Sequence, residues 1–158
     1  MMQNKSEKER FSENGEMIYD FGDEFLVVCP KCQGMAKIVS SVVNSEKLNS
    51  KLFAPRQLIC LKCVHRDSWK GGEIAIGGNF DWYFRLPLWL QISCCGKILW
   101  SYNEKHLDFL ENYVKAKLRE RIPNTNKSLA SRLPQWIKSA KNRREILKAI
   151  EKLRNNLP

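Results

Sequence analysis

Long hydrophobic runs are missing from this sequence of 158 residues. The stretch from Leu86 to Leu90 is apolar, but it is short and contains Pro87, whereas a membrane-spanning helix needs about 20 apolar residues. The first ten residues are mostly polar or charged, and they lack the apolar segment of a secretory signal peptide. We therefore expect a cytoplasmic protein with no membrane segment.

A nucleotide-binding phosphate loop is also missing. The glycine pairs at 71–72 and 77–78 are not followed by the Gly-Lys-Ser/Thr sequence that such a loop requires. We interpret both pairs as turns. A motor helicase needs that loop and a much longer chain, so we do not expect this class of enzyme.

Four of the six cysteines, in contrast, form two Cys-x-x-Cys knuckles, Cys29-Pro30-Lys31-Cys32 and Cys60-Leu61-Lys62-Cys63. Two such knuckles, brought together by hairpins, supply four thiolates in a closed tetrahedron with no position left for water or substrate. This arrangement is typical of a structural zinc site, which contributes to folding rather than to catalysis. We predict one Zn²⁺ per chain, bound by Cys29, Cys32, Cys60 and Cys63.

Three other interpretations of these cysteines remain. Disulfides would require an oxidising compartment, and a redox Cys-x-x-Cys would begin a helix, whereas a turn and a strand follow Cys32. Iron bound by the same four thiolates is the third. His65 follows Cys63 closely and is an alternative ligand, although four thiolates already complete the site.

The hydrophobic pattern predicts an α+β protein: a β-rich zinc ribbon extended by a second β-hairpin and followed by a C-terminal helical region. Strands are expected at 25–28, 35–43, 56–59 and 68–70, with the second hairpin at 88–93 and 97–102 and its turn at 94–96. Helices are expected at 104–121 and 134–155, with a short helical turn at 128–132. This divides the chain into a flexible N-terminal tail (1–23), a zinc-ribbon domain (24–103) and a basic helical region (104–158).

Positive charge is concentrated in the last third of the chain. Residues 104–158 contain 14 Lys and Arg against 6 Asp and Glu, whereas residues 1–103 contain 13 against 11. Such a region can neutralise phosphates, although an amphipathic helix also carries charge on its solvated face. If DNA or RNA is the partner, we expect the contacts to come from Lys138, Lys141, Arg143, Arg144, Lys148 and Lys152.

The later part of the chain resembles a bacterial family of proteins with a transcription factor IIB-type zinc ribbon. The resemblance begins near Val28 and depends on the two knuckles, Leu86–Gln91, Cys95-Gly96 with Leu99-Trp100, Tyr102-Asn103 with His106-Leu107, and Leu129–Arg143. Members are sometimes labelled primosomal replication-restart helicases, a label that the missing phosphate loop contradicts for this chain. The resemblance thus implies a zinc ribbon but no particular activity.

Two further groups of residues need an interpretation. Cys95, Asn103 and His106 have the residue types of a cysteine hydrolase. Asn103, however, also suits a helix cap. Cys94 and Cys95 are expected to be structural thiols on opposite faces of a strand. The aromatics Trp69, Trp82, Tyr83, Phe84, Trp89 and Trp100 suit core packing, base stacking or a protein contact. We therefore predict a non-enzymatic, zinc-binding accessory protein with nucleic acid as its favoured partner. A protein-interaction adaptor is the alternative, and a cysteine hydrolase is the third interpretation.

Overall fold

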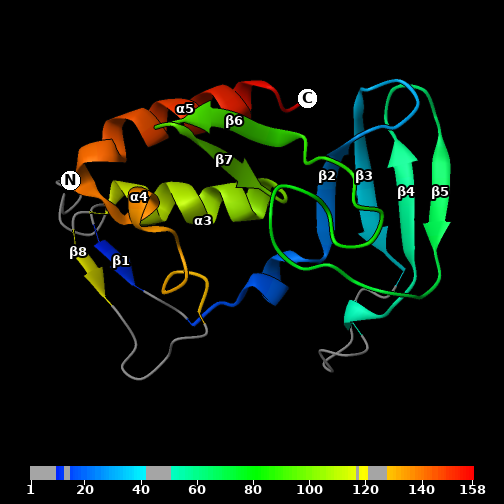
Figure 1. Ribbon diagram of the computed structural model, residues 1–158, viewed down its shortest axis with the longest axis horizontal. Helices are drawn as coiled ribbons and strands as arrows, with labels where there is room; N and C mark the ends of the chain where they lie inside the picture. Colours follow the sequence, from blue (N-terminus) through cyan, green and yellow to red (C-terminus); the bar gives the residue numbers. More distant parts are fainter. Residues whose placement is uncertain (1–9, 13–14, 42–50, 117, 121–127) are drawn as a thin grey trace, which may run out of the picture. The chain divides into compact units, whose positions relative to one another are not determined.

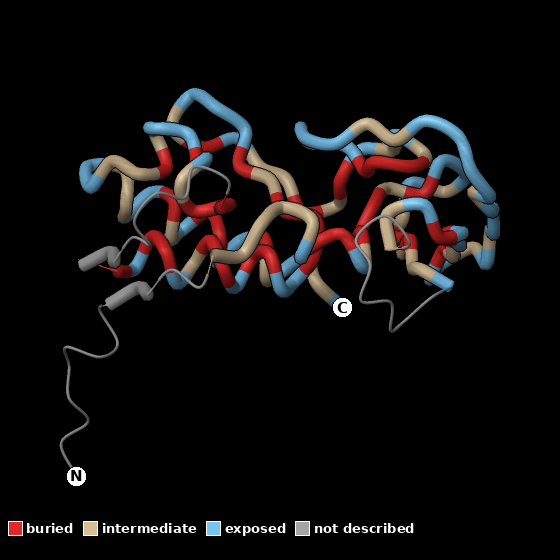
Figure 2. The backbone as a smooth tube through the Cα atoms, turned by 90° about the horizontal axis from the view of Figure 1, so that it is seen from below, coloured by how far each residue is buried: buried red, intermediate tan, exposed pale blue. Residues whose placement is uncertain are grey.

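The protein has an α+β fold (Figure 1), which a computed structural model describes for residues 10–12, 15–41, 51–116, 118–120 and 128–158. The chain forms two compact units. Unit 2 comprises Tyr19–Gln91 and Trp100–Glu104, and unit 1 comprises Met1–Ile18, Ile92–Leu99 and Lys105–Pro158. Buried residues, red in Figure 2, alternate with exposed ones along much of the described chain.

Unit 2 is built on an antiparallel sheet of four strands in the order β2-β3-β4-β5. The strands are β2 (Glu24–Val28), β3 (Met35–Ser40), β4 (Arg56–Cys60) and β5 (Arg66–Trp69). Alternating apolar residues set the register, and in β4 the buried side chains of Arg56, Leu58 and Cys60 alternate with more exposed ones. The predicted ribbon strands are confirmed. Residues 42–43, predicted as the end of a strand, and most of the predicted loop at 44–51 lie outside the described residues.

Aromatic side chains form the core of unit 2. Trp82, Phe25 and Tyr102 are each 0% exposed, and the Phe25 ring meets those of Trp82 and Tyr102 edge-on at centroid distances of 5.0 and 5.2 Å. Tyr83, which is 6% exposed, stacks under the guanidinium of Arg56 at 4.3 Å. Of the uses expected for the aromatic residues, Trp82 and Tyr83 therefore serve core packing and are not exposed for base stacking or a protein contact.

The loop that carries these aromatics is organised by one buried carboxylate. Asp81 is 0% exposed, and its Oδ1 accepts hydrogen bonds from the backbone N–H groups of Tyr83 and Phe84 at 2.8 and 2.7 Å. Its Oδ2 accepts from the N–H of Leu86 at 2.6 Å. Burial raises the pKa of Asp81, while these N–H groups oppose that shift. One side chain thus satisfies three backbone N–H groups of this irregular loop.

The second hairpin consists of β6 (Leu90–Cys94) and β7 (Lys97–Ser101). Its turn is the dipeptide Cys95-Gly96, with φ of 55° and 72°, as a type I′ turn requires. Cys94 therefore ends a strand instead of lying in the turn. Ile92–Leu99 of this hairpin belongs to unit 1, whereas the predicted zinc-ribbon domain (24–103) includes the whole hairpin.

Unit 1 contains the amphipathic helices α3 (Glu104–Lys115) and α5 (Arg143–Asn155). The apolar stripes predicted for them are buried, with Leu107, Leu110 and Val114 on α3 and Ile146, Ile150 and Leu153 on α5. The prediction that α3 continues to Arg121 is wrong. The chain leaves the helix after Lys115, and β8 (Leu118–Glu120) pairs in parallel with β1 (Arg10–Ser12).

The prediction of one helix from 134 to 155 is also wrong. The chain forms α4 (Gln135–Lys138), a 3₁₀ turn η2 (Ala140–Asn142) and then α5, with an extended Ser139 at ψ 125° between the first two. In a continuous helix the carbonyl of Trp136 would accept from the amide of Ala140. It accepts instead from the side-chain amide of Asn142 at 2.9 Å, and this replacement compensates for the break.

The tail assignment for residues 1–23 is too wide. Besides β1, this segment includes a 3₁₀ helix, η1 (Ile18–Phe21), whose Phe21 is 1% exposed. The carbonyl of Glu16 accepts a hydrogen bond from the N–H of Leu129 at 2.7 Å. Residues 1–9 and 13–14 lie outside the described part. Among the helices that the structure describes, none has the length and apolar character needed to cross a membrane.

Candidate metal centre

The first knuckle closes the β2–β3 hairpin. The N–H of Cys29 donates to the carbonyl of Gly34 at 2.8 Å, and the N–H of Gln33 donates to the carbonyl of Cys29 at 2.9 Å. Gln33 adopts a left-handed conformation with φ 62°. This tight turn directs the N–H groups of Lys31 and Gly34 at the sulfurs of Cys29 and Cys32, at 3.4 and 3.3 Å. Both thiols are thus held by the backbone.

The second knuckle, between β4 and β5, repeats this geometry. The N–H groups of Lys62 and Cys63 both lie 3.3 Å from the sulfur of Cys60, and Val64 has a φ of 59°, matching Gln33 in the first knuckle. The N–H of Cys60 donates to the carbonyl of His65 at 2.9 Å. His65 therefore supports the turn through its backbone and is not part of the cysteine group.

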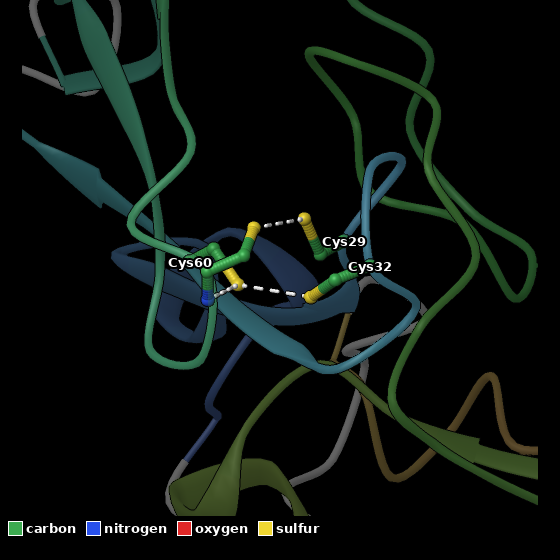
Figure 3. A group of neighbouring side chains, drawn as sticks. Cys29, Cys32 and Cys60 are labelled. Atoms are coloured by element: carbon green, nitrogen blue, oxygen red, sulfur yellow. Dashed lines mark hydrogen bonds between the residues drawn. The ribbon is translucent and has the colours of Figure 1, made fainter.

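Pairing of β3 with β4 brings the knuckles together. Ala36 lies opposite Cys60 in the register, and the N–H of Leu61 donates to the carbonyl of Met35 at 3.1 Å. Figure 3 shows Cys29 and Cys32 pointing from their turn toward Cys60 on the facing turn. The four sulfurs of Cys29, Cys32, Cys60 and Cys63 all lie within 4.8 Å of one another.

The sulfur–sulfur distances match a metal site better than disulfides. They are 3.7 Å between Cys29 and Cys63 and 3.5 Å between Cys32 and Cys60. A tetrahedron with Zn–S bonds of about 2.3 Å has edges of about 3.8 Å, whereas a disulfide bond is about 2.0 Å long. The four cysteines can therefore hold one metal ion. Cys29 and Cys60 are 0% and 2% exposed, so two of the ligands lie well inside the protein.

The electrostatics of the group are compatible with a bound cation. The N–H of Cys63, together with that of Lys62, lowers the pKa of Cys60 to about 6. At Cys63 the backbone hydrogen bond from His65 acts in the same direction, but burial and the neighbouring thiols outweigh it and raise the pKa to about 12. Four sulfurs at this separation cannot all ionise without a compensating positive charge. A bound metal ion would supply that charge, so the four cysteines are compatible with a metal site.

The residues of the hydrolase interpretation have other environments. The sulfur of Cys95 lies 3.5 Å from that of Cys94 and 3.3 Å from Oε2 of Glu145. Burial, followed by these two neighbours, raises the pKa of Cys95 to about 12, which keeps it a thiol. The expected opposite orientation of the two cysteines is wrong, because Cys95 lies in the turn and not in the strand.

His106 and Asn103 serve packing. His106 is 2% exposed, and burial lowers its pKa to about 3, so the imidazole is neutral at pH 7. Asn103 directly precedes α3, as expected of a cap, and its side-chain amide donates to the carbonyls of Phe21 and Glu24 at 2.8 and 2.7 Å. Asn103 thereby ties η1 to β2 within unit 2.

The six basic residues predicted for nucleic acid divide into two groups. The guanidinium of Arg143 donates to the carbonyls of Val114 and Ala116 at 3.0 and 3.4 Å, so it caps the end of α3. The ammonium of Lys138 donates to the carbonyl of Ser131 at 2.9 Å. These two stabilise the fold. The exposed members are Lys141, Arg144, Lys148 and Lys152.

Sequence analysis missed two cations that lie beside this group, Lys115 and Arg154. Glu111 binds both, through Oε1 to Lys115 at 2.7 Å and through Oε2 to Nε of Arg154 at 3.0 Å. The spacing of Glu111 and Lys115 on a helix indicates the first contact. Arg154 is contributed by a different helix, so no local pattern identifies it.

The chain was compared with protein-family models, with curated proteins and with solved structures. None of the three comparisons found a match. The assignment of a function to this chain therefore depends on its own geometry and chemistry.

Proposed function

We propose that the protein is a zinc-stabilised, non-enzymatic accessory protein that binds nucleic acid. The observation that carries the zinc assignment is the group of four cysteine sulfurs within 4.8 Å. Sulfur ligands in a tetrahedral set favour zinc over magnesium, calcium or manganese. All four coordination positions are filled by the chain, so the ion would hold the two knuckles together and would not meet substrate.

The distribution of charge supports the nucleic-acid part of the proposal. Residues 104–158 carry 14 basic against 6 acidic residues, and Lys141, Arg144, Lys148 and Lys152 are exposed. Lysine and arginine side chains on one surface bind phosphates by releasing counterions, largely independently of base sequence. The high pKa of Cys95 supports the non-enzymatic assignment, because the thiol form is a poor nucleophile.

Metal analysis tests the zinc assignment. We expect one zinc per chain in purified protein and its loss in Cys60→Ser, with a large drop in melting temperature, because structural zinc contributes about 10–16 kcal/mol of apparent binding energy in zinc-finger peptides. Cys94→Ser is the matched control: Cys94 is also buried but lies outside the group, so this variant should keep its zinc. A metal-free protein of full stability, or zinc retained in Cys60→Ser, would refute the assignment.

Nucleic-acid binding is tested separately with the zinc-loaded wild type. Single- and double-stranded oligonucleotides are titrated at 50 mM salt, where phosphate contacts are strongest. Binding of either supports the proposal, and failure to bind both contradicts it.

A protein-interaction adaptor is the second candidate, and the second knuckle favours it. Leu61 and Val64 are 53% and 80% exposed although both are apolar. Apolar side chains at the tip of a rigid turn are suited to a protein contact. This candidate would lead if wild-type protein binds no nucleic acid.

A further inference from the structure

Unit 1 contains a groove along α3, η2 and α5, with a volume of about 780 Å³. The two helices run in opposite directions here, because Arg143 at the start of α5 binds the end of α3, while Arg154 near the end of α5 reaches back to Asp108 at 2.6 Å. Six cationic and two carboxylate side chains line the groove. Among its described lining residues none is aromatic.

One of the two carboxylates in the groove, Glu111, is paired with cations of the groove, and the second, Glu151, is exposed. Glu111 is shared by Lys115 and Arg154, and these two cations, acting against burial, lower the pKa of Glu111. The guanidinium of Arg143 faces the carbonyls of Val114 and Ala116. It thereby offsets the negative end of the α3 dipole, which would otherwise repel an anion.

Three cations remain without such a partner. In the described part of the chain the side chains of Lys141, Arg144 and Lys148 form no hydrogen bond or ion pair, and all three are exposed. They follow one another from η2 into the first two turns of α5. The adjoining N-terminal amides of α5 receive no side-chain cap from Asn142, so the helix dipole adds to the same positive field.

We propose that this groove binds the phosphodiester backbone of single-stranded nucleic acid, with Lys141, Arg144 and Lys148 as the phosphate contacts. This inference rests on the nucleic-acid function proposed above. Lys115 on α3 and the three cations on η2 and α5 face a strand in the groove from its two sides. A duplex would present only one of its two phosphate rows to a concave site of this size. The lining residues that the structure describes offer no aromatic ring for base stacking, so recognition is of the backbone and not of the base.

The number of contacts gives a measurable salt dependence. Each phosphate contact with a single strand contributes about −0.7 to the slope of log K against log salt, so three contacts give about −2. Substitution of both Arg144 and Lys148 by Gln removes two contacts. The slope should then fall to about −0.7, and affinity at 0.1 M salt should drop about 25-fold.

The test is fluorescence anisotropy with a labelled 20-nucleotide oligo-dT and a duplex of the same length, at 50 to 200 mM salt. The groove variant Arg144→Gln/Lys148→Gln is compared with Lys70→Gln/Lys97→Gln, which removes the same charge at two exposed positions outside the groove. We expect the control to bind oligo-dT within about threefold of wild type. The groove variant should bind it about 25-fold more weakly at 0.1 M salt, because only this variant removes direct phosphate contacts.

Three results would overturn the inference. Equal losses in the groove variant and its control would show an effect of net charge alone, with nucleic-acid binding itself retained. Tighter binding of the duplex than of oligo-dT would exclude a single-strand site but would leave the proposed nucleic-acid-binding function in place. Absence of wild-type binding to either probe would remove both the inference and the nucleic-acid function on which it rests.

Discussion

Removal of the Asp81 carboxylate should destabilise unit 2 more than any exposed acidic substitution. Asp81 is fully buried and accepts three backbone hydrogen bonds of 2.6 to 2.8 Å from Tyr83, Phe84 and Leu86. The same loop positions Trp82 in the aromatic core. The substitutions Asp81→Ala and Asp81→Asn differ in how many of these bonds they remove.

The structure sets the size and order of the two effects. A buried donor left without a partner costs about 1–3 kcal/mol, so the loss of all three acceptors in Asp81→Ala should cost about 4 kcal/mol, allowing for water reaching the partly exposed Leu86 end. Asn keeps an oxygen for Tyr83 and Phe84 but turns an NH₂ group toward Leu86. Its cost should be about 2 kcal/mol, because one bond is lost and the others no longer involve a charge.

Urea unfolding of the zinc-loaded protein, followed by tryptophan fluorescence, measures these values. Asp67→Asn is the matched control: Oδ1 of Asp67 also accepts a backbone N–H, from Ser68 at 2.8 Å, but at an exposed site, so its effect should stay within about 0.5 kcal/mol. Equal costs for Asp81→Asn and Asp81→Ala, or a cost below about 1 kcal/mol for both, would refute the reasoning from buried N–H groups. Zinc content should be unchanged in all three variants, because Asp81 is not a ligand.

Two further predictions concern individual side chains. The pKa of His106 is about 3 in the fold and about 6.5 in the unfolded chain. Between pH 3 and pH 6.5 the imidazole is therefore protonated only in the unfolded state. The free energy of unfolding then falls by about 1.4 kcal/mol for each pH unit below 6.5. His106→Gln should therefore reduce the loss of unfolding free energy between pH 6.5 and 5 by about 2 kcal/mol, as measured by urea unfolding at each pH, and an unchanged slope would contradict a buried neutral imidazole. Val64 is a β-branched residue at φ 59° and is 80% exposed, so Val64→Gly should raise stability by about 0.5–1 kcal/mol through relief of left-handed strain. Gln33→Gly at the matching position, with φ 62°, should gain less, and a destabilised Val64→Gly protein in thermal unfolding would contradict the strain argument.

Local sequence patterns were sufficient where the structure is local. The knuckle at Cys29 to Cys32 is a turn whose hydrogen bonds close within a few residues, and the buried stripes of α3 and α5 follow from helical periodicity. The spacing of the cysteines alone identified the group that the structure brings together. These features were predictable because neighbouring residues determine them.

The parts that could not be predicted depend on distant partners. The end of α3 at Lys115 has no glycine or proline signal, and the carbonyls there are satisfied by Arg143, which follows almost thirty residues later. The break at Ser139 depends on the side chain of Asn142. The same limit applies to the groove, since Arg154 enters it from a separate helix. A periodic apolar pattern therefore predicts a helix that is too long wherever a tertiary contact ends the helix early.

The parallel pair of β1 and β8 has a consequence for the order in which the chain folds. Arg10 pairs with Leu118, so β1 must wait for roughly a hundred further residues to be synthesised, which takes about 5–20 s on a ribosome. The four-stranded sheet of unit 2 is complete once Trp69 has emerged. Closing the longer loop also costs about 2 kcal/mol more chain entropy than closing one a tenth as long. The two knuckles can thus come together early in synthesis, while β1 stays an unpaired strand, open to other chains, until β8 has been made.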